Sequence, residues 1–383
     1  MELTLVVATL SIALILSNLA SIVLAASRLK RRRAMAPPAG KPRPVSIVVP
    51  SRGVEPFTLE TLERAFSLNW PRYELIFCVA HADDPVVRLI NRAIARFPKV
   101  PARLLVGDDR ISANPKLNNC VKGWEAARHD WVVLADSNVL MPRDYVQHLM
   151  AAWRPNTGLV CSTPIGSRPA GFWAEVECAF LNTLQARWQY AGEALGLGFA
   201  QGKSMLWNKP ILDANGGIRA LAAEIAEDAA ATKLVNGLGL RVNLVAAPFE
   251  QPLGRRTFGE IWSRQARWAR LRRVTFPLFF APEILTGAVV PLVLALIAAA
   301  SAGISPWATA IAVLAAFYLP ECVLARSKGW YLSPRLVAAM VTRDLILPAM
   351  WARGWLGGAV EWRGNAMTIG TKAAKLEETP SGA

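Results

Sequence analysis

The segment "WVVLADSN" at residues 131–138 joins a short apolar run to a carboxylate. Its first five residues are apolar and β-rich, as in strands that are buried on both faces of a sheet. Asp136 follows directly, at the carboxyl end of this predicted strand. Open α/β sheets bind ligands beyond the carboxyl ends of their strands, so the segment points to both a fold and a site.

Similar apolar runs on both sides of this segment extend the prediction. Four of them are predicted strands: residues 45–49, 74–79, 102–107 and 158–163. Helical patterns separate several of these runs, at residues 59–66, 86–97 and 119–127. The alternation predicts an α/β domain with a largely parallel sheet covered on both faces. We expect this domain over residues 45–275, after a basic and Pro-rich linker at residues 28–44.

The N-terminal segment is predicted to be a membrane anchor over residues 1–27. Residues 3–26 carry no charge, and such a run can cross a hydrocarbon core of about 30 Å. The basic cluster at residues 28–33 follows the apolar run, whereas a cleaved signal peptide carries its charge in front. By the positive-inside rule, the chain after the anchor faces the cytoplasm.

A second membrane region is predicted over residues 276–363, followed by a polar tail at residues 364–383. Residues 284–304 and 306–325 are apolar and of spanning length. Residues 336–356 contain Arg343, Asp344 and Arg353, and charges at this depth usually face protein or water. We expect this last segment to re-enter or to lie in the interface. The sequence therefore predicts a multi-pass protein of the inner membrane with a cytoplasmic domain.

The composition narrows the classes of ligand. The 383 residues carry a formal net charge of +15, which indicates nucleic acid or anionic lipid as a partner. Because the basic residues flank apolar runs, we expect lipid and no nucleic acid. The five cysteines include no CxxC pair, so neither a zinc site nor a disulfide framework is indicated.

Carboxylates follow two of the predicted strands. Asp83 and Asp84 follow the strand at residues 74–79, and Asp136 follows the strand at residues 131–135. Carboxylates held at strand ends could bind a divalent cation or a nucleotide ribose. Alternatively, Asp84 before Pro85 is a helix cap, and Asp136 makes an Asx-turn.

Three further segments contain candidate site residues. In "NPKLNN", Lys116 could hold a phosphate and Asn118 or Asn119 a base or sugar, or the segment is a capped surface loop. Glu227 and Asp228 open a predicted helix, as dipole partners or with one of them as a buried general base. The glycine-containing loop "GFAQGKSMLW" at residues 198–207 indicates a binding loop but lacks the P-loop pattern.

The segment "RQARWARLRR" at residues 264–273 concentrates arginines next to the second membrane region. On a helix, Arg264, Arg267 and Trp268 share one face. Guanidinium groups bind phosphate bidentately, so these residues could clamp a diphosphate. The other arginines of the segment, at positions 270, 272 and 273, are expected to meet anionic head groups.

Taken in order, "HADDP", "NPKLNN", "ADSN", "AEDAAATK", "RQARWARLR" and "EWRGNAM" resemble the motifs of ceramide glucosyltransferases. This is glycosyltransferase family 21, which has the GT-A fold and is related to family 2. The resemblance covers nearly the whole chain. Position 138 is Asn, where relatives of this type commonly have Gly.

The resemblance implies a reaction and a set of roles. The reaction is inverting transfer of a hexose from a UDP-sugar, UDP-glucose, to the primary hydroxyl of ceramide, giving a β-glycoside. Asp228 would be the catalytic base, and Asp136 would bind Mg²⁺ or Mn²⁺ on the diphosphate. The resemblance further implies donor contacts by Pro50, Asp84, Lys116 and Asn119, and diphosphate or acceptor contacts by Arg264, Arg267 and Trp268.

Two alternatives remain open from the sequence. The acceptor could be a hopanoid polyol or diacylglycerol, with UDP-GlcNAc or UDP-galactose as donor. Alternatively, the chain could be a non-catalytic membrane protein that binds anionic lipid or nucleic acid. The carboxylates argue against the second alternative, because an anion-binding scaffold gains nothing from Asp84, Asp136 and Asp228 beside its site.

Overall fold

The computed structural model describes residues 2–37, 40–356, 359–362 and 365–368. The chain divides into two compact units, each made of separate stretches of sequence. We call them the sheet unit (Arg33–Pro164, Gly198–Pro252 and Trp362–Ala383) and the helical unit (Met1–Arg32, Ile165–Leu197 and Leu253–Glu361).

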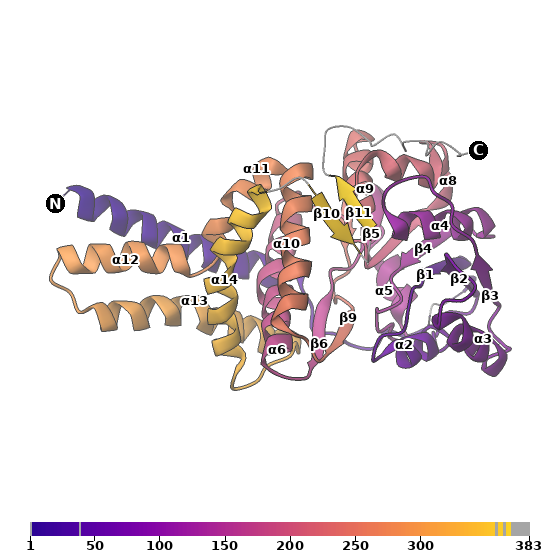
Figure 1. Cartoon of the computed structure of the whole chain (residues 1–383), viewed down its shortest axis with the longest axis horizontal. Helices are drawn as coiled ribbons and strands as arrows, with labels where there is room; N and C mark the ends of the chain where they lie inside the picture. Colours follow the sequence, from indigo (N-terminus) through magenta and orange to yellow (C-terminus); the bar gives the residue numbers. More distant parts are fainter. Residues whose placement is uncertain (1, 38–39, 357–358, 363–364, 369–383) are drawn as a thin grey trace, which may run out of the picture. The chain divides into compact units, whose positions relative to one another are not determined.

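The sheet unit is built on a seven-stranded sheet with the strand order β3-β2-β1-β4-β7-β5-β8 (Figure 1). Its strands are β1 (Val45–Pro50), β2 (Tyr73–Val79), β3 (Ala102–Val106), β4 (Trp131–Ala135), β5 (Thr157–Cys161), β7 (Ser204–Asn208) and β8 (Arg241–Leu244). Strands β1 to β4 pair in parallel, and β7 lies antiparallel between β4 and β5. The predicted α/β class is confirmed, and all five strands expected from the apolar runs are present.

The helices of the sheet unit lie between these strands in the chain. They are α2 (Thr58–Ala65), α3 (Val86–Arg96), α4 (Pro115–Ala126), α5 (Tyr145–Ala151), α8 (Lys209–Asp213), the 3₁₀ helix η2 (Gly217–Ala223) and α9 (Glu227–Gly237). Helix α4 packs closely on the sheet, because a Cβ at Gly123 would lie 2.4 Å from Val48 Cγ1 and 2.7 Å from Cys78 Sγ. Every residue of β1, β2, β4 and β5 is buried, as the continuous apolar runs predict.

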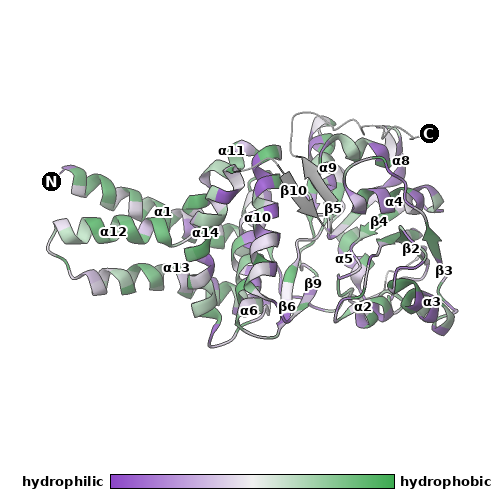
Figure 2. Cartoon of the chain, viewed as in Figure 1, coloured by the Kyte–Doolittle hydropathy of each residue, from purple (hydrophilic) through white to green (hydrophobic). Residues whose placement is uncertain are grey.

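The helical unit contains the long apolar helices of the chain (Figures 1 and 2). Its helices are α1 (Glu2–Arg28), α6 (Phe172–Cys178), the π-helix η1 (Ala179–Ala186), α7 (Arg187–Ala194), α10 (Phe258–Thr275), α11 (Pro277–Phe280), the 3₁₀ helix η3 (Ala281–Thr286), α12 (Val289–Ser301), α13 (Pro306–Lys328) and α14 (Leu336–Trp355). Two short sheets complete the described chain, formed by β6 (Ile165–Pro169) with β9 (Glu250–Gly254) and by β10 (Ala359–Trp362) with β11 (Asn365–Thr368).

Two described helices, α1 and α13, are long and apolar enough to cross a membrane. A third candidate is the pair formed by Pro277–Thr286 and Val289–Ser301, which bends by 51° at a short break. The straight span expected over residues 284–304 is therefore a shorter helix after a bend. A Cβ at Gly287 would lie 3.0 Å from Leu347 Cδ2 and 3.2 Å from Asp344 Cγ, so the break brings the backbone close to α14.

The compact unit around the sheet differs from the continuous range predicted over residues 45–275. Residues 165–197 and 253–275 group with the apolar helices instead. Helices α6 and α10 pack on α14, and α7 packs on α1. A buried cluster that includes Val176, Ile261 and Leu347 joins these segments. The polar tail predicted at residues 364–383 lies outside the described residues, except for 365–368 in β11.

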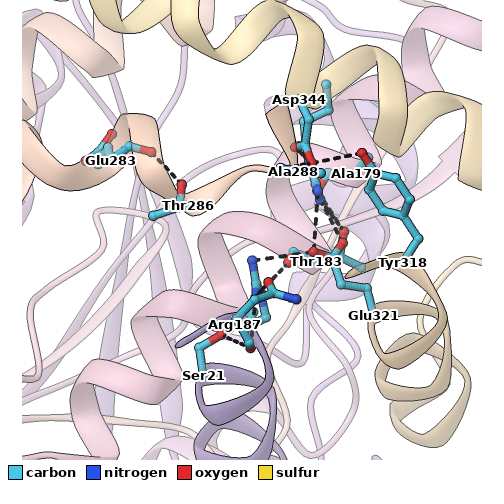
Figure 3. Close-up of polar contacts among 12 residues, drawn as sticks. Ser21, Ala179, Thr183, Arg187, Glu283, Thr286, Ala288, Tyr318, Glu321 and Asp344 are labelled. Carbon is cyan, nitrogen blue, oxygen red and sulfur yellow. Dashed lines mark hydrogen bonds and ion pairs between the residues drawn. The ribbon is translucent and has the colours of Figure 1, made fainter. Parts of the chain in front are cut away.

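The helical unit also contains a buried ionic cluster, which we call the arginine network: Arg187, Glu321, Arg343 and Asp344 (Figure 3). Arg343 Nη1 donates to Glu321 Oε2 at 3.0 Å, and its Nε donates to Asp344 Oδ1 at 2.7 Å. Arg187 Nη2 lies 3.4 Å from Glu321 Oε1. The four formal charges cancel, and each of these side chains is at most 1% exposed.

Neutral polar groups extend the arginine network to neighbouring helices (Figure 3). On α1, Ser21 Oγ accepts a hydrogen bond from Arg187 Nη1 at 2.8 Å, and Asn18 Oδ1 accepts another from the same nitrogen. Tyr318 on α13 donates to Asp344 Oδ2 at 3.0 Å. Arg343 and Asp344 of α14 thus face protein, as expected for charges in an apolar segment.

Candidate functional site

The candidate site lies in the sheet unit, where β4 ends and β7 begins. Asp136 follows β4 and Lys203 precedes β7, and the two strands pair so that Ala135 faces Ser204. The backbone N–H of Asp136 donates to the Lys203 carbonyl at 3.0 Å. Lys203 Nζ lies 2.7 Å from Asp136 Oδ2 and donates to Asn138 Oδ1 at 3.0 Å. The antiparallel pairing therefore holds a lysine against the carboxylate that the sequence singles out.

The first turn of α4 brings Lys116 to the other oxygen of this carboxylate. Lys116 Nζ lies 2.7 Å from Asp136 Oδ1 and 2.7 Å from Glu227 Oε1, and it also donates to the Gly202 carbonyl. Helix α4 begins at Pro115, and the Asn114 side chain accepts from the backbone N–H groups of Lys116 and Leu117. The expected helix start at residue 119 was therefore four residues late.

Glu227 and Asp228 open α9 as predicted, with different partners. Glu227 is buried and accepts from Asn114 Nδ2 at 2.6 Å in addition to its ion pair with Lys116. Asp228 is half-buried and accepts from the backbone N–H groups of Gly202 at 3.1 Å and Ala229 at 2.9 Å. Together, Lys116, Asp136, Lys203, Glu227 and Asp228 form what we call the acid–lysine site.

Gly202 lies against the acid–lysine site through its backbone. A Cβ at this position would lie 2.6 Å from Glu227 Oε1, 2.8 Å from Lys116 Nζ and 3.5 Å from Asp228 Oδ2. Contacts under 3.0 Å would force these side-chain ends to shift, so glycine allows the backbone to approach Glu227 and Lys116 without displacing them. The loop predicted to bind a ligand thus contributes a backbone N–H, a carbonyl and Lys203.

The charges of the acid–lysine site shift one another's pKa values. Burial alone would raise the pKa of Asp136, but the ammonium groups of Lys116 and Lys203 hold it well below its usual range. Burial alone would lower the pKa of Lys116, but the carboxylates of Asp136 and Glu227 raise it. Burial, together with the neighbouring Glu227 carboxylate, raises the pKa of Asp228 to about 6. With this pKa, Asp228 can exchange a proton near neutral pH.

The side-chain oxygens of Asp136 and Asn138, beside Lys203, could bind a hard cation together with oxygens of a substrate. Among the residues that the structure describes, no group of three or more His, Cys, Asp or Glu side chains could hold a metal ion. Asp136 and Asn138 offer carboxylate and amide oxygens, and Mg²⁺ commonly binds through one or two carboxylates plus substrate phosphates. The residues fit a divalent cation in that mode.

Three other predicted donor-binding residues have structural partners of their own. Asp84 accepts from the backbone N–H of Gly53 at 3.0 Å and from that of Val86, the first residue of α3, at 2.9 Å, whereas the N-cap position of α3 is Pro85. Asn119 is buried and accepts from Lys122 Nζ at 2.9 Å. Pro50 is the buried last residue of β1. Because β1, β2 and β4 are parallel neighbours, Pro50 and Asp84 lie towards the same sheet edge as Asp136.

The predicted arginine clamp lies on α10, in the helical unit. The segment is helical, as expected, and begins with a capping box formed by Thr257 and Glu260. Arg264 Nη1 lies 3.2 Å from Glu177 Oε1, a carboxylate that is 1% exposed. Trp268 packs against a buried cluster of Cys178, Leu181 and Leu253. Arg264, Arg267 and Trp268 thus belong to the helical unit, and their roles remain predictions.

Sequence reasoning missed the pairing of Lys203 with Asp136 and the capping role of Asn114 beside the site. It marked the loop at residues 198–207 but did not pair Lys203 with Asp136, because the position of β7 between β4 and β5 is not visible in the apolar pattern. It also read Asn114 as part of a loop. The sequence "NPK" does contain a signal for this residue, since Asn before Pro is a common start of a helix.

Comparison with known proteins places the chain among glycosyltransferases. The model of the family "Glycosyl transferase family 21" matches residues 13–374. Ceramide glucosyltransferase 3 of Caenorhabditis elegans is 28% identical over 235 residues, which are 61% of this chain and 51% of that protein. Ceramide glucosyltransferase of Komagataella phaffii is 37% identical over 99 residues, 25% of this chain and 19% of that protein.

One solved structure that matches the chain is the mannosyltransferase PcManGT from Pyrobaculum calidifontis in complex with GDP-Man and Mn²⁺. It is 20% identical, with a TM-score of 0.48, and the match covers 88% of this chain and 99% of that one. The chain spans about half the length of the Caenorhabditis elegans relatives that it matches.

Proposed function

Because the chain belongs to glycosyl transferase family 21, we propose that it transfers a hexose from a nucleoside-diphosphate sugar to the hydroxyl group of a membrane lipid. The observation that carries this proposal is the acid–lysine site. It combines one carboxylate with a pKa of about 6, two lysines and a carboxylate paired with both of them. A glycosyl transfer needs a base for the acceptor and positive charge for the leaving group.

Asp228 acts as the base in this proposal. A lipid hydroxyl is a weak nucleophile until its proton is removed, and a base is most effective when its pKa lies near the working pH. The N–H groups of Gly202 and Ala229 orient the Asp228 carboxylate. Attack from the side opposite the leaving group would invert the sugar carbon and give a β-glycoside from an α-linked donor.

The leaving diphosphate is met by positive charge in the same site. Lys116 and Lys203 would pair with phosphate oxygens, and Asp136 with Asn138 would hold Mg²⁺ or Mn²⁺. When bound, such a cation would stabilise the negative charge of the diphosphate. Pro50, Asp84 and Asn119 would contact the nucleoside end of the donor. Contacts with the diphosphate and the acceptor are assigned to Arg264, Arg267 and Trp268.

The named relatives support a specific pair of substrates. The two relatives are ceramide glucosyltransferases, so we assign UDP-glucose as donor and the primary hydroxyl of ceramide as acceptor. Helices α1 and α13 are apolar enough to cross a membrane, which supports a location in the inner membrane with the sheet unit in the cytoplasm. There the donor is soluble, and the lipid hydroxyl lies in the head-group plane.

Product analysis tests the substrates directly. Membranes that contain the chain are incubated with labelled UDP-glucose, UDP-galactose and UDP-GlcNAc, each with ceramide, diacylglycerol and a hopanoid polyol. Mass analysis should detect a β-hexosylceramide formed from UDP-glucose. Transfer only to another lipid would replace the acceptor in the proposal, and no transfer with any pair would refute the activity.

Chelation tests the cation in the same assay. Exhaustive treatment with EDTA should abolish transfer, and Mn²⁺ or Mg²⁺ should restore it. The Asp136→Asn variant should not regain wild-type turnover at any concentration of added cation, whereas a residue that only makes an Asx-turn would tolerate Asn. Full activity after chelation would remove the cation from the mechanism.

A further inference from the structure

We propose that Lys203 controls entry of the divalent cation, so that the chain binds the cation together with a nucleoside diphosphate and not before it. Lys203 would move from Asp136 to a phosphate oxygen when the diphosphate arrives. This inference rests on the proposed function, because it assumes that donor and cation use the acid–lysine site. It adds a role for a residue of the loop at residues 198–207 to which the family resemblance assigns none.

Both oxygens of the Asp136 carboxylate are already paired with lysines. Each of its two oxygens lies 2.7 Å from an ammonium nitrogen, Lys116 on Oδ1 and Lys203 on Oδ2. Asn138 Oδ1, the other oxygen suited to a hard cation, accepts from Lys203 as well. A cation that approaches alone therefore meets an ammonium group at each of these three oxygens.

The two lysines differ in how many of these oxygens they contact. Lys116 also binds Glu227 Oε1 and the Gly202 carbonyl, so its ammonium stays in place without Asp136. Of the three oxygens suited to a cation, Lys203 contacts two, Asp136 Oδ2 and Asn138 Oδ1, whereas Lys116 contacts one, Asp136 Oδ1. Its side chain is 16% exposed and that of Asp136 is 20% exposed, so a small ligand can reach both. Lys203 is thus the lysine that a cation has to displace.

The balance of charges in the acid–lysine site also favours joint binding of cation and diphosphate. Fully ionised, Asp136, Glu227 and Asp228 carry three negative charges, and Lys116 and Lys203 carry two positive ones. A divalent cation alone would be repelled by the two ammonium groups that already pair with Asp136. A diphosphate brings negative oxygens that pair with Lys203 and also ligate the cation. By thermodynamic linkage, the cation must then improve diphosphate binding by the factor by which diphosphate improves cation binding.

Titration of the purified full chain in detergent with Mn²⁺ tests this coupling, because electron paramagnetic resonance counts free Mn²⁺ without any turnover. Wild-type protein should bind Mn²⁺ at least about tenfold more tightly with UDP than without it, a coupling within the usual range. Lys203→Met should bind Mn²⁺ without UDP at least about tenfold more tightly than wild type does. The same variant should bind UDP more weakly.

Two further variants fix the location and the specificity of the effect. Lys209→Met removes a lysine of similar burial at the other end of β7, 3.8 Å from Asp213, and should behave like wild type. Adding Asp136→Asn to Lys203→Met should abolish the gained Mn²⁺ binding. Retention of melting temperature and circular dichroism by each variant shows that the fold is intact.

The inference is refuted if wild-type protein binds Mn²⁺ equally well with and without UDP, or if Lys203→Met leaves metal-only binding unchanged. Gained binding that survives Asp136→Asn would also refute it, since the site would lie elsewhere. These outcomes are distinguishable from failure of the proposed function. Coupled binding of UDP and Mn²⁺ without transfer to any lipid refutes the function alone, whereas transfer without the coupling refutes the role of Lys203 alone.

Discussion

The acid–lysine site and the arginine network both pair buried or half-buried charges, but they differ in access to solvent. In the acid–lysine site, the side chains of Lys116 and Asp136 are 12% and 20% exposed. In the arginine network, Arg187 and Glu321 are fully buried. A charge that can be reached can exchange its partner for a ligand, whereas a closed set of charges can only hold helices together.

The partners of the two clusters agree with this division. The arginine network is electrically neutral and joins residues of α1, η1, α7, α13 and α14. The acid–lysine site has one formal negative charge in excess and a backbone N–H aimed at Asp228. We therefore expect that damage to the network lowers stability, and that damage to the site lowers activity in a folded protein.

The largest effect is expected from Glu321→Gln. This change leaves Arg187 and Arg343 buried without their shared carboxylate, and breaking a buried ion pair costs about 3–5 kcal/mol of unfolding free energy. Denaturant or thermal unfolding of the detergent-purified chain measures it. Glu283→Gln is the control, because Glu283 pairs with Arg272 at a half-exposed site and should cost at most about 1 kcal/mol. Equal losses in the two variants would show that the network is not a stabilising unit.

The next effect concerns the base. Asp228→Asn should fold and bind UDP but transfer sugar at least about a hundredfold more slowly, the lower end of general base catalysis. Glu227→Gln should be milder. Because the raised pKa of Asp228 is about 6, the wild-type rate should fall as the pH drops through 6, where the carboxylate takes up a proton.

A rate assay from pH 5 to pH 8 checks both parts of this prediction. If Asp228→Asn keeps most of its rate while Glu227→Gln loses it, the neighbouring carboxylate is the base. If both variants keep their rates, neither residue is the base, and the proposed mechanism fails.

Adding a methyl group at Gly202 should lower the transfer rate without removing any charged group of the acid–lysine site. The Gly202→Ala side chain would collide with Glu227 and Lys116, and displacement of catalytic groups by about 1 Å can slow a reaction on the order of a hundredfold. We expect a loss between about tenfold and a hundredfold in the transfer rate. Gly237→Ala, where a Cβ would meet nothing within 4 Å, should stay near wild type. Wild-type rates in Gly202→Ala would mean that this loop moves away from the site during turnover.

The smallest effect is expected from Arg267→Lys, which keeps the charge but loses the bidentate fork. Transfer should fall by about tenfold, roughly the value of one charge-assisted hydrogen bond, while the fraction of protein in the membrane stays constant. Replacing Arg272 and Arg273 together should instead weaken membrane association more than donor binding. Unchanged turnover in Arg267→Lys would leave only an anchoring role for this arginine.

The sequence predicted β1, β2, β4 and β5 well because strands that are buried on both faces form continuous apolar runs, whereas β7 and β8 were not predicted. The run at residues 131–135 matches β4 to the residue, and the other predicted strands differ by one or two residues at their ends. Helix α4 was less well predicted, since its first turn contains polar residues that resemble a loop. What decided its start was the hydrogen bonding of Asn114, which is local and can be recognised once Pro115 is taken as a first helical residue.

Contacts between distant residues could not be predicted from local patterns. Residues 165–197 show nothing in the sequence to group them with the apolar helices, because the partners of Arg187 lie at Asn18, Ser21 and Glu321. The pairing of Lys203 with Asp136 depends on an antiparallel strand inserted into a parallel set. The bend before α12 likewise lies where Gly287 approaches α14, a contact between distant residues that no local pattern predicts.

The bond between Arg187 and Asn18 has a consequence for the timing of biosynthesis. The two residues are 169 positions apart, so at about 5–20 residues per second the Asn18 side chain waits on the order of 10–30 s for its partner. Glu321 and Arg343 are synthesised later still. During this interval α1 carries polar groups whose final partners do not yet exist. A chain whose translation stops before Arg187 therefore keeps a first helix whose polar side chains lack these partners. A cellular protease or chaperone could distinguish such a chain from the finished protein.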